Sequence, residues 1–145
     1  DLPLYSYDRI FAMGNDTLIV ELYDTLLHPY DASSLALAKS DYADLPERDP
    51  GEHWYDSIKL SHSLSQKGKK VHTAAFDRCA MEYLESFLTA AKAAPDCDAA
   101  PKREKASVYV EGLLKHGGPS TDVFKKGIGE EKTAELFRKV LFATE

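Results

Sequence analysis

The sequence is poor in the residues that mark metal centres and disulfide frameworks. Its 145 residues include two cysteines and five histidines, with no Cys-x-x-Cys motif and no two histidines four residues apart. These gaps exclude zinc ribbons, thioredoxin chemistry and c-type haem attachment. No apolar run approaches the roughly 20 residues of a transmembrane helix. We therefore expect a soluble chain with no metal site, no cofactor and no transmembrane segment.

Catalytic motifs are missing as well. There is no Gly-x-Ser-x-Gly nucleophile elbow, and the glycines at 127 and 129 are followed by Glu130 and Glu131, which would repel a phosphate. No catalytic residue is assigned for this reason. The residues favour a non-enzymatic role, although one sequence leaves open a catalytic triad that is assembled in space.

Basic residues are outnumbered by acidic ones. The chain has 18 Lys and Arg against 24 Asp and Glu, a net charge of −6. It lacks the cation surplus that nucleic-acid binding requires, so no nucleic-acid partner is expected. Residues 1–66 hold twelve acidic and four basic residues, whereas residues 67–145 hold twelve acidic and fourteen basic ones. This uneven layout favours an oriented contact with another protein, and two solvated faces are the alternative explanation.

The chain begins Asp1-Leu2-Pro3 rather than with methionine. Removal of a targeting peptide is one explanation, and trimming of the chain is the other. The first would place the protein in a secreted or organelle-lumen compartment. The sequence alone leaves the location open.

The strongest pattern in the sequence is the apolar spacing typical of α-helices. Apolar residues recur at steps of three and four from Val71 to Ala93, and Pro95 ends this helix. Asp49 and Pro50 are typical of a helix start, and the helix they begin is expected to reach about Ser65. Further helical segments are predicted over residues 16–27, 34–42, 102–115, 119–124 and 130–142.

No segment shows the strict alternation of a strand. We therefore expect residues 1–145 to form a single all-α domain, a four- to five-helix up-and-down bundle with a long irregular loop near residues 29–49. The central helix should also separate the two thiols. Cys79 lies fourteen residues before Ala93, a rise of about 21 Å, and the four residues to Cys97 recover about 14 Å. No disulfide is expected.

Aromatic side chains with a polar tip are concentrated in the first part of the chain. Residues 1–55 contain six of the eight tyrosines and the single tryptophan. Tyr and Trp are enriched at protein interfaces because they bury area and keep a hydrogen bond, although they would also serve to cap the bundle. The candidate partner-binding residues are Tyr30, Asp41, Tyr42, Asp44, Trp54 and Tyr55.

These observations favour a protein-binding or accessory subunit that is not an enzyme and that uses its acidic, Tyr-rich N-terminal half to bind a protein partner. A carrier or enzyme with a pocket between helices, near Trp54, His62 and His72, is the first alternative. A self-assembling structural subunit is the second. The oligomeric state is left open.

Overall fold

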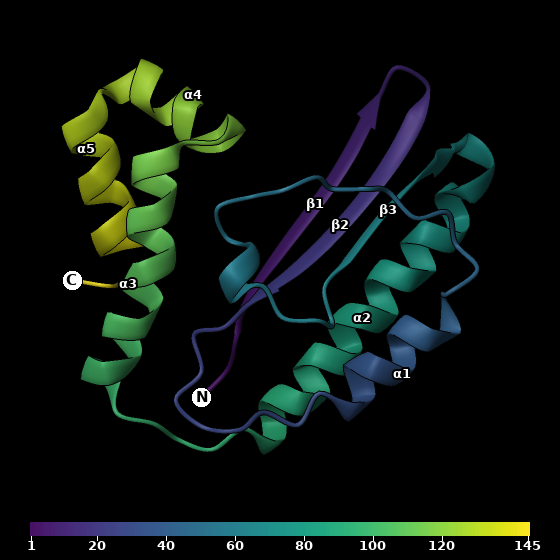
Figure 1. Cartoon of the computed structure of the whole chain (residues 1–145), viewed down its shortest axis with the longest axis horizontal. Coiled ribbons are helices and arrows are strands. Elements are labelled where there is room, and N and C mark those ends of the chain that lie inside the picture. Colours follow the sequence, from purple (N-terminus) through teal and green to yellow (C-terminus); the bar gives the residue numbers. More distant parts are fainter.

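An antiparallel sheet lies at the centre of the protein, whose computed structural model describes all 145 residues (Figure 1). Its three strands follow in the order β1-β2-β3, so β2 is the central strand. Their bounds are Leu4–Ala12 for β1, Asn15–Tyr23 for β2 and Leu64–Lys69 for β3.

A two-residue turn joins β1 to β2. Met13 and Gly14 both have positive φ angles, 52° and 71°, and Ala12 pairs with Asn15 on either side of them. Two successive residues with positive φ form the hairpin turn whose twist matches that of the flanking strands. Glycine adopts this conformation readily, and Met13 is 98% exposed at the tip of the hairpin.

A long connection leads from β2 to β3. It contains the helix α1 (Ser33–Asp41) and the short 3₁₀ turn η1 (Asp56–Ile58). Between them the chain runs beside β3, where Lys67 N–H donates to the Pro46 carbonyl and Arg48 N–H donates to the Ser65 carbonyl, each at 3.0 Å. In Figure 1 the segment then passes across the sheet to reach η1.

The main core lies between the sheet and helices α1 and α2. A 3₁₀ turn, η2 (Lys70–His72), leads directly from β3 into α2 (Thr73–Ala93). Alternate residues of β2 point to these helices because side chains alternate along a strand. The buried cluster contains Leu18, Val20, Leu22, Leu35, Ala38, Leu64, Phe76, Cys79 and Tyr83.

The C-terminal helices lie on the opposite side of the sheet from α1 and α2 (Figure 1). They are α3 (Ala99–His116), α4 (Pro119–Ile128) and α5 (Glu130–Glu135), which continues into the π-helical segment η3 (Leu136–Leu141). Phe137 is buried among them and contacts the rings of Phe124 and Phe142 at centroid distances of 5.7 and 5.9 Å.

The expected all-α bundle is wrong, because the structure is mixed and contains this sheet. The segment predicted as a helix over residues 16–27 is β2, and the helix predicted from Asp49 is irregular chain that ends in β3. Strand β2 is buried on both faces, so its apolar residues run on without alternation and their spacing also fits a helix. Asp16, expected near a helix start, instead forms a buried ion pair with Arg9 at 2.7 Å.

The other helical predictions are confirmed. The helix from Val71 to Ala93 is α2, the segment at 34–42 is α1, and the helices expected after residue 100 are α3, α4, and α5 with η3. Because of α1, residues 29–49 are less irregular than expected. Both thiols are free, with Cys79 buried and Cys97 half-buried. None of the helices is both long enough and apolar enough to cross a membrane.

Candidate functional site

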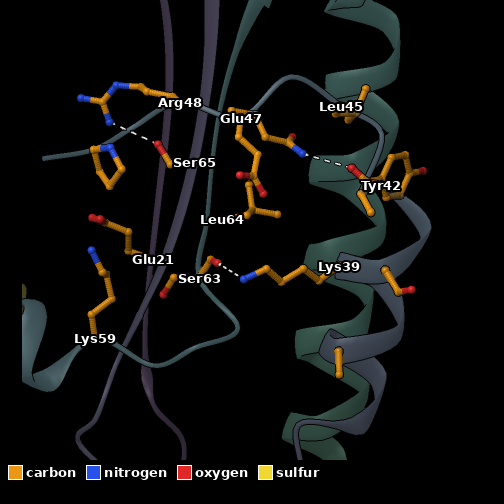
Figure 2. A pocket seen from close by; sticks show the side chains of 15 residues that line it. Glu21, Lys39, Tyr42, Leu45, Glu47, Arg48, Lys59, Ser63, Leu64 and Ser65 are labelled. Atoms are coloured by element: carbon orange, nitrogen blue, oxygen red, sulfur yellow. Dashed lines mark hydrogen bonds between the residues drawn. The ribbon is translucent and has the colours of Figure 1, made fainter.

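A polar cleft of 480 Å³ opens at the β3 edge of the sheet (Figure 2). We call it the β3 cleft. Fifteen residues line it, and all of them lie between positions 21 and 66, within the acidic part of the chain. They come from β2, from the C-terminal half of α1, from the irregular chain that follows it, and from β3. The cleft therefore forms where α1 and the returning chain close over an edge strand.

Two cations of the cleft have no carboxylate partner. Lys39 Nζ, at the end of α1, donates to the carbonyls of Ser61 and Ser63 at 2.7 and 2.8 Å. Arg48 donates to Ser65 Oγ at 3.2 Å. Figure 2 shows these two side chains on either side of β3. The third cation, Lys59, is instead neutralised by Asp56 at 2.7 Å.

Two acceptor side chains border the cleft from opposite faces of the sheet, because Gln66 lies beside Leu18 of the main core whereas Glu21 points away from that core. Gln66 is 6% exposed, and its Nε2 donates weakly to the Tyr42 carbonyl at 3.4 Å. Its Oε1 is buried and accepts no hydrogen bond within the protein. A buried acceptor without a donor costs about 1–3 kcal/mol. Glu21 is also buried, and its Oε2 accepts one hydrogen bond, from the Tyr23 hydroxyl at 2.6 Å.

Two effects raise the pKa of the Tyr23 hydroxyl, namely its burial and its hydrogen bond to Glu21. Burial of the Tyr23 ring raises the pKa of its hydroxyl, and donation to Glu21 raises that pKa further. The phenol therefore stays protonated and keeps donating at any pH at which the protein works. This fixes the orientation of the Glu21 carboxylate on the face of the sheet away from α1 and α2.

Of the predicted partner-binding residues, Tyr42 is the one that lines the cleft. Its hydroxyl donates to Glu82 at 2.7 Å, a bond that ties the end of α1 to α2 and raises the pKa of Tyr42 to about 12. Asp41 and Asp44 are exposed beside it at the end of α1. Tyr30 is elsewhere, packed against the main core with its hydroxyl buried.

Trp54 and Tyr55 belong to an internal aromatic cluster rather than to the cleft. Tyr23 contacts both Tyr55 and Tyr109 of α3, at centroid distances of 5.3 and 4.3 Å. The Trp54 ring stacks on His116 at 5.5 Å. The cluster therefore joins the sheet to α3, so the alternative explanation, that these aromatic side chains pack within the fold, fits this pair.

A pocket was expected near Trp54, His62 and His72, but these three residues lie in different parts of the structure. Trp54 packs on α3, whereas the His72 ring stacks on Phe76 at 6.0 Å. The His62 carbonyl accepts a hydrogen bond from the Tyr83 hydroxyl at 2.5 Å. No three His, Cys, Asp or Glu side chains come together in a geometry that could hold a metal ion.

No pattern in the sequence identified the cations and the glutamine of the cleft as candidate site residues. Lys39, Arg48 and Gln66 border one cleft because β3 forms and the chain at 46–48 pairs with it, and that strand was not predicted. No local signal marks them. No family model matches the chain, and no curated protein matches it at a significant level.

Proposed function

We propose that the chain is a non-enzymatic domain that binds a protein partner, and that the β3 cleft holds an extended segment of that partner. The observation that carries the proposal is the buried Gln66 Oε1, which has no donor within the fold. Most buried polar atoms of native proteins are hydrogen-bonded, so an exception in a residue that lines a cleft supports a role for a donor that binds there once the Gln66 amide turns toward the cleft.

A peptide fits the chemistry of the cleft better than an apolar small molecule. Ten of the fifteen lining residues are polar or charged, and a small apolar ligand would leave their polar groups without partners. A peptide backbone offers an N–H donor for Gln66 and a carbonyl acceptor for a cation at each step. Because Lys39 and Arg48 lack carboxylate partners, acidic side chains on the segment would be favoured.

Two variants of the cleft test this proposal. Gln66→Met keeps the side-chain volume and removes both the unpaired acceptor and the weak Nε2 bond to the Tyr42 carbonyl, so the two effects offset and the free energy of unfolding should change by less than about 1 kcal/mol. The same change should weaken partner capture about tenfold, since a hydrogen bond in the complex is lost. Arg48→Glu reverses a charge at the mouth and should also weaken capture.

The measurement is affinity capture from the native source with quantitative mass spectrometry, with circular dichroism of each variant alongside. Lys92→Glu is the matched control for charge, because Lys92 is exposed at the far end of α2 and should leave capture unchanged. Capture by Gln66→Met and Arg48→Glu at the wild-type level would contradict the proposal. So would a wild-type protein that captures nothing.

A further inference from the structure

One end of the sheet carries the two most exposed large apolar side chains of the protein. Met13, in the hairpin turn, is 98% exposed, and Val71, in η2, is 83% exposed. The two turns lie at the same end in Figure 1. A hollow of 580 Å³ opens between them, lined by Met13, by Lys70 and by Phe11, which is 66% exposed. Single exposed apolar side chains are ordinary, but several that gather at one place indicate an interaction surface.

The backbone of Met13 makes its position unusual. Its φ angle of 52° is one that glycine and asparagine adopt readily and that strains a larger side chain. Packing does not explain the methionine, since its side chain is almost fully exposed. A strained turn that holds an apolar side chain in solvent supports a role for that side chain outside the fold.

Three exposed lysines, Lys67, Lys69 and Lys70, lie at the same end of the molecule. Lys67 and Lys69 are near the end of β3, and Lys69 Nζ donates to Asn15 Oδ1 at 2.8 Å, beside the hairpin turn. Lys70 follows in η2 and lines the hollow. None of the three forms an ion pair within the fold. Their charges are therefore free to bind an anion outside the fold.

The carboxylates at this end do not cancel the lysines. Asp16 and Asp77 are the acidic residues that line the hollow, and Arg9 contacts them at 2.7 and 3.1 Å. Glu47, which is opposite Gln66, lines the β3 cleft instead. Arg9 and the three lysines thus outnumber the two carboxylates of the hollow, although the chain as a whole carries −6. This end therefore attracts anionic partners.

We propose that this end of the sheet docks on a lipid bilayer that contains anionic phospholipids. We call it the tip surface; its members are Phe11, Met13, Lys67, Lys69, Lys70 and Val71. The apolar side chains enter the boundary between headgroups and acyl chains, and the lysines contact the lipid phosphates from the polar side of that boundary.

A bilayer fits the tip surface better than an acidic protein does. In a bilayer an anionic layer covers an apolar one, and here apolar side chains stand out from two turns with lysines around them. An acidic protein segment would pair with the lysines and give Met13 no reason to occupy a strained position. None of the residues of the tip surface lines the β3 cleft, so docking goes beyond the function proposed there.

Cosedimentation of the full chain with lipid vesicles tests the proposal. The protein should bind vesicles of mixed phosphatidylcholine and phosphatidylserine, and should not bind vesicles of phosphatidylcholine alone. Salt should weaken the binding because it screens the lysines. The triple variant Lys67→Gln, Lys69→Gln and Lys70→Gln should bind at least about tenfold more weakly, since each lysine near an anionic surface contributes about fivefold.

Met13→Asn separates docking from folding. Asparagine suits the positive φ angle, so the thermal stability of the fold should stay the same or rise. Loss of the apolar side chain should nevertheless weaken vesicle binding about tenfold. Val123→Gln in α4 is the matched control, because Val123 is also exposed and lies near Lys125 and Lys126, and it should leave vesicle binding unchanged.

A polarity-sensitive fluorophore reports insertion directly. In a Cys97→Ser background Cys79 is buried and stays unlabelled. The fluorophore on Met13→Cys should then shift to shorter wavelength on phosphatidylserine vesicles, whereas the same fluorophore on Val123→Cys should not.

Three results would overturn the proposal. The first is a wild-type protein that does not bind phosphatidylserine vesicles at low salt, and the second is a Met13→Asn variant that binds them as tightly as wild type. The third is equally tight binding to polyglutamate, which would identify an acidic protein segment as the partner. None of these results would affect partner capture at the β3 cleft.

Discussion

Residues 1–93 and residues 99–142 bury their apolar side chains to different extents. The first region has a continuous core of nine buried residues between the sheet and helices α1 and α2. In the second, three apolar side chains are buried, those of Tyr109, Val110 and Phe137. The same helices expose six others, namely Val108, Val123, Phe124, Ile128, Val140 and Leu141. Apolar burial is the dominant favourable term in folding, so the two regions should differ in stability.

The second region is held to the first largely by polar and aromatic contacts. Lys102 Nζ donates to Asp1 Oδ1 at 2.8 Å and to the Thr25 carbonyl at 2.5 Å, and Lys105 donates to the Leu26 carbonyl at 2.6 Å. Burial lowers the pKa of Lys102. The lost hydration of its ammonium group therefore offsets part of the stabilisation that these contacts provide. We therefore expect the C-terminal helices to open before the sheet region does.

The largest expected effect comes from removing a core aromatic in each region. Phe76→Ala, in the sheet region, should lower the free energy of unfolding by about 3–5 kcal/mol and expose the whole chain to hydrogen exchange. Phe137→Ala removes the same side chain from a site that is also buried. It should raise exchange in α4 and α5 while leaving β2 protected.

Hydrogen exchange read by mass spectrometry, with urea unfolding of both variants, checks this pair. The comparison between the regions would be broken if Phe137→Ala exposed β2 as strongly as it exposes α4. It would be sharpened if the wild-type C-terminal helices already exchange faster than β2.

Within the first region, the distance over which the signal of an element is spread explains which elements could be predicted from the sequence. Helix α2 has a local apolar period and a proline after it, so its signal lies within its own residues. Strand β2 depends on β1 and on β3, which lies over 40 residues further along the chain. Its signal is therefore spread over distant residues, and the run Leu18-Ile19-Val20 fits a buried strand and a helix equally well. The Met13-Gly14 turn was the one local clue to the hairpin.

The candidate site was predictable to the same limited degree. The acidic, Tyr-rich part of the chain and Tyr42 could be identified from composition, and the β3 cleft lies there. Lys39, Arg48 and Gln66 could not, because their convergence requires β3 and its bonds to residues 46–48. Trp54 and Tyr55 were assigned to a surface because sequence alone cannot show that α3 returns to cover them.

An intermediate effect is expected at alkaline pH from Cys79 in the sheet region. Burial raises the pKa of its thiol from 9.0 to about 11. The unfolded chain then loses the Cys79 proton above about pH 9 while the folded chain keeps it, so stability is fully present below pH 9 and falls above it. At pH 10 the loss should be about 1.4 kcal/mol.

Urea unfolding of wild type and Cys79→Ala between pH 8 and pH 10 isolates this contribution, because the other titrating groups are common to both proteins. The Cys79→Ala variant should lose less stability over this range. Cys97→Ser is the control, since this half-buried thiol lies in the linker between the two regions. Equal pH dependence in wild type and Cys79→Ala would show that the sheet region does not hold this thiol in its neutral form.

The smallest effect concerns two glycines of the C-terminal helices. It bears most directly on how the two regions are joined. Alanine at a helical glycine normally adds about 0.5–1 kcal/mol of stability. Gly127 in α4 has open space around it, so Gly127→Ala should show this gain. At Gly112 in α3 an added Cβ would lie 2.0 Å from the Trp54 ring, so Gly112→Ala should instead destabilise by about 1 kcal/mol.

The sign of the Gly112 effect depends on Trp54 and can be reversed. In a Trp54→Ala background the obstruction is gone, so Gly112→Ala should become stabilising, as Gly127→Ala is in both backgrounds. Thermal unfolding of the four combinations measures the coupling between positions 54 and 112. If Gly112→Ala stabilises the protein with Trp54 still present, then α3 does not rest on this ring. The C-terminal helices would then be joined to the sheet by Lys102, Lys105 and the Tyr23–Tyr109 contact without it.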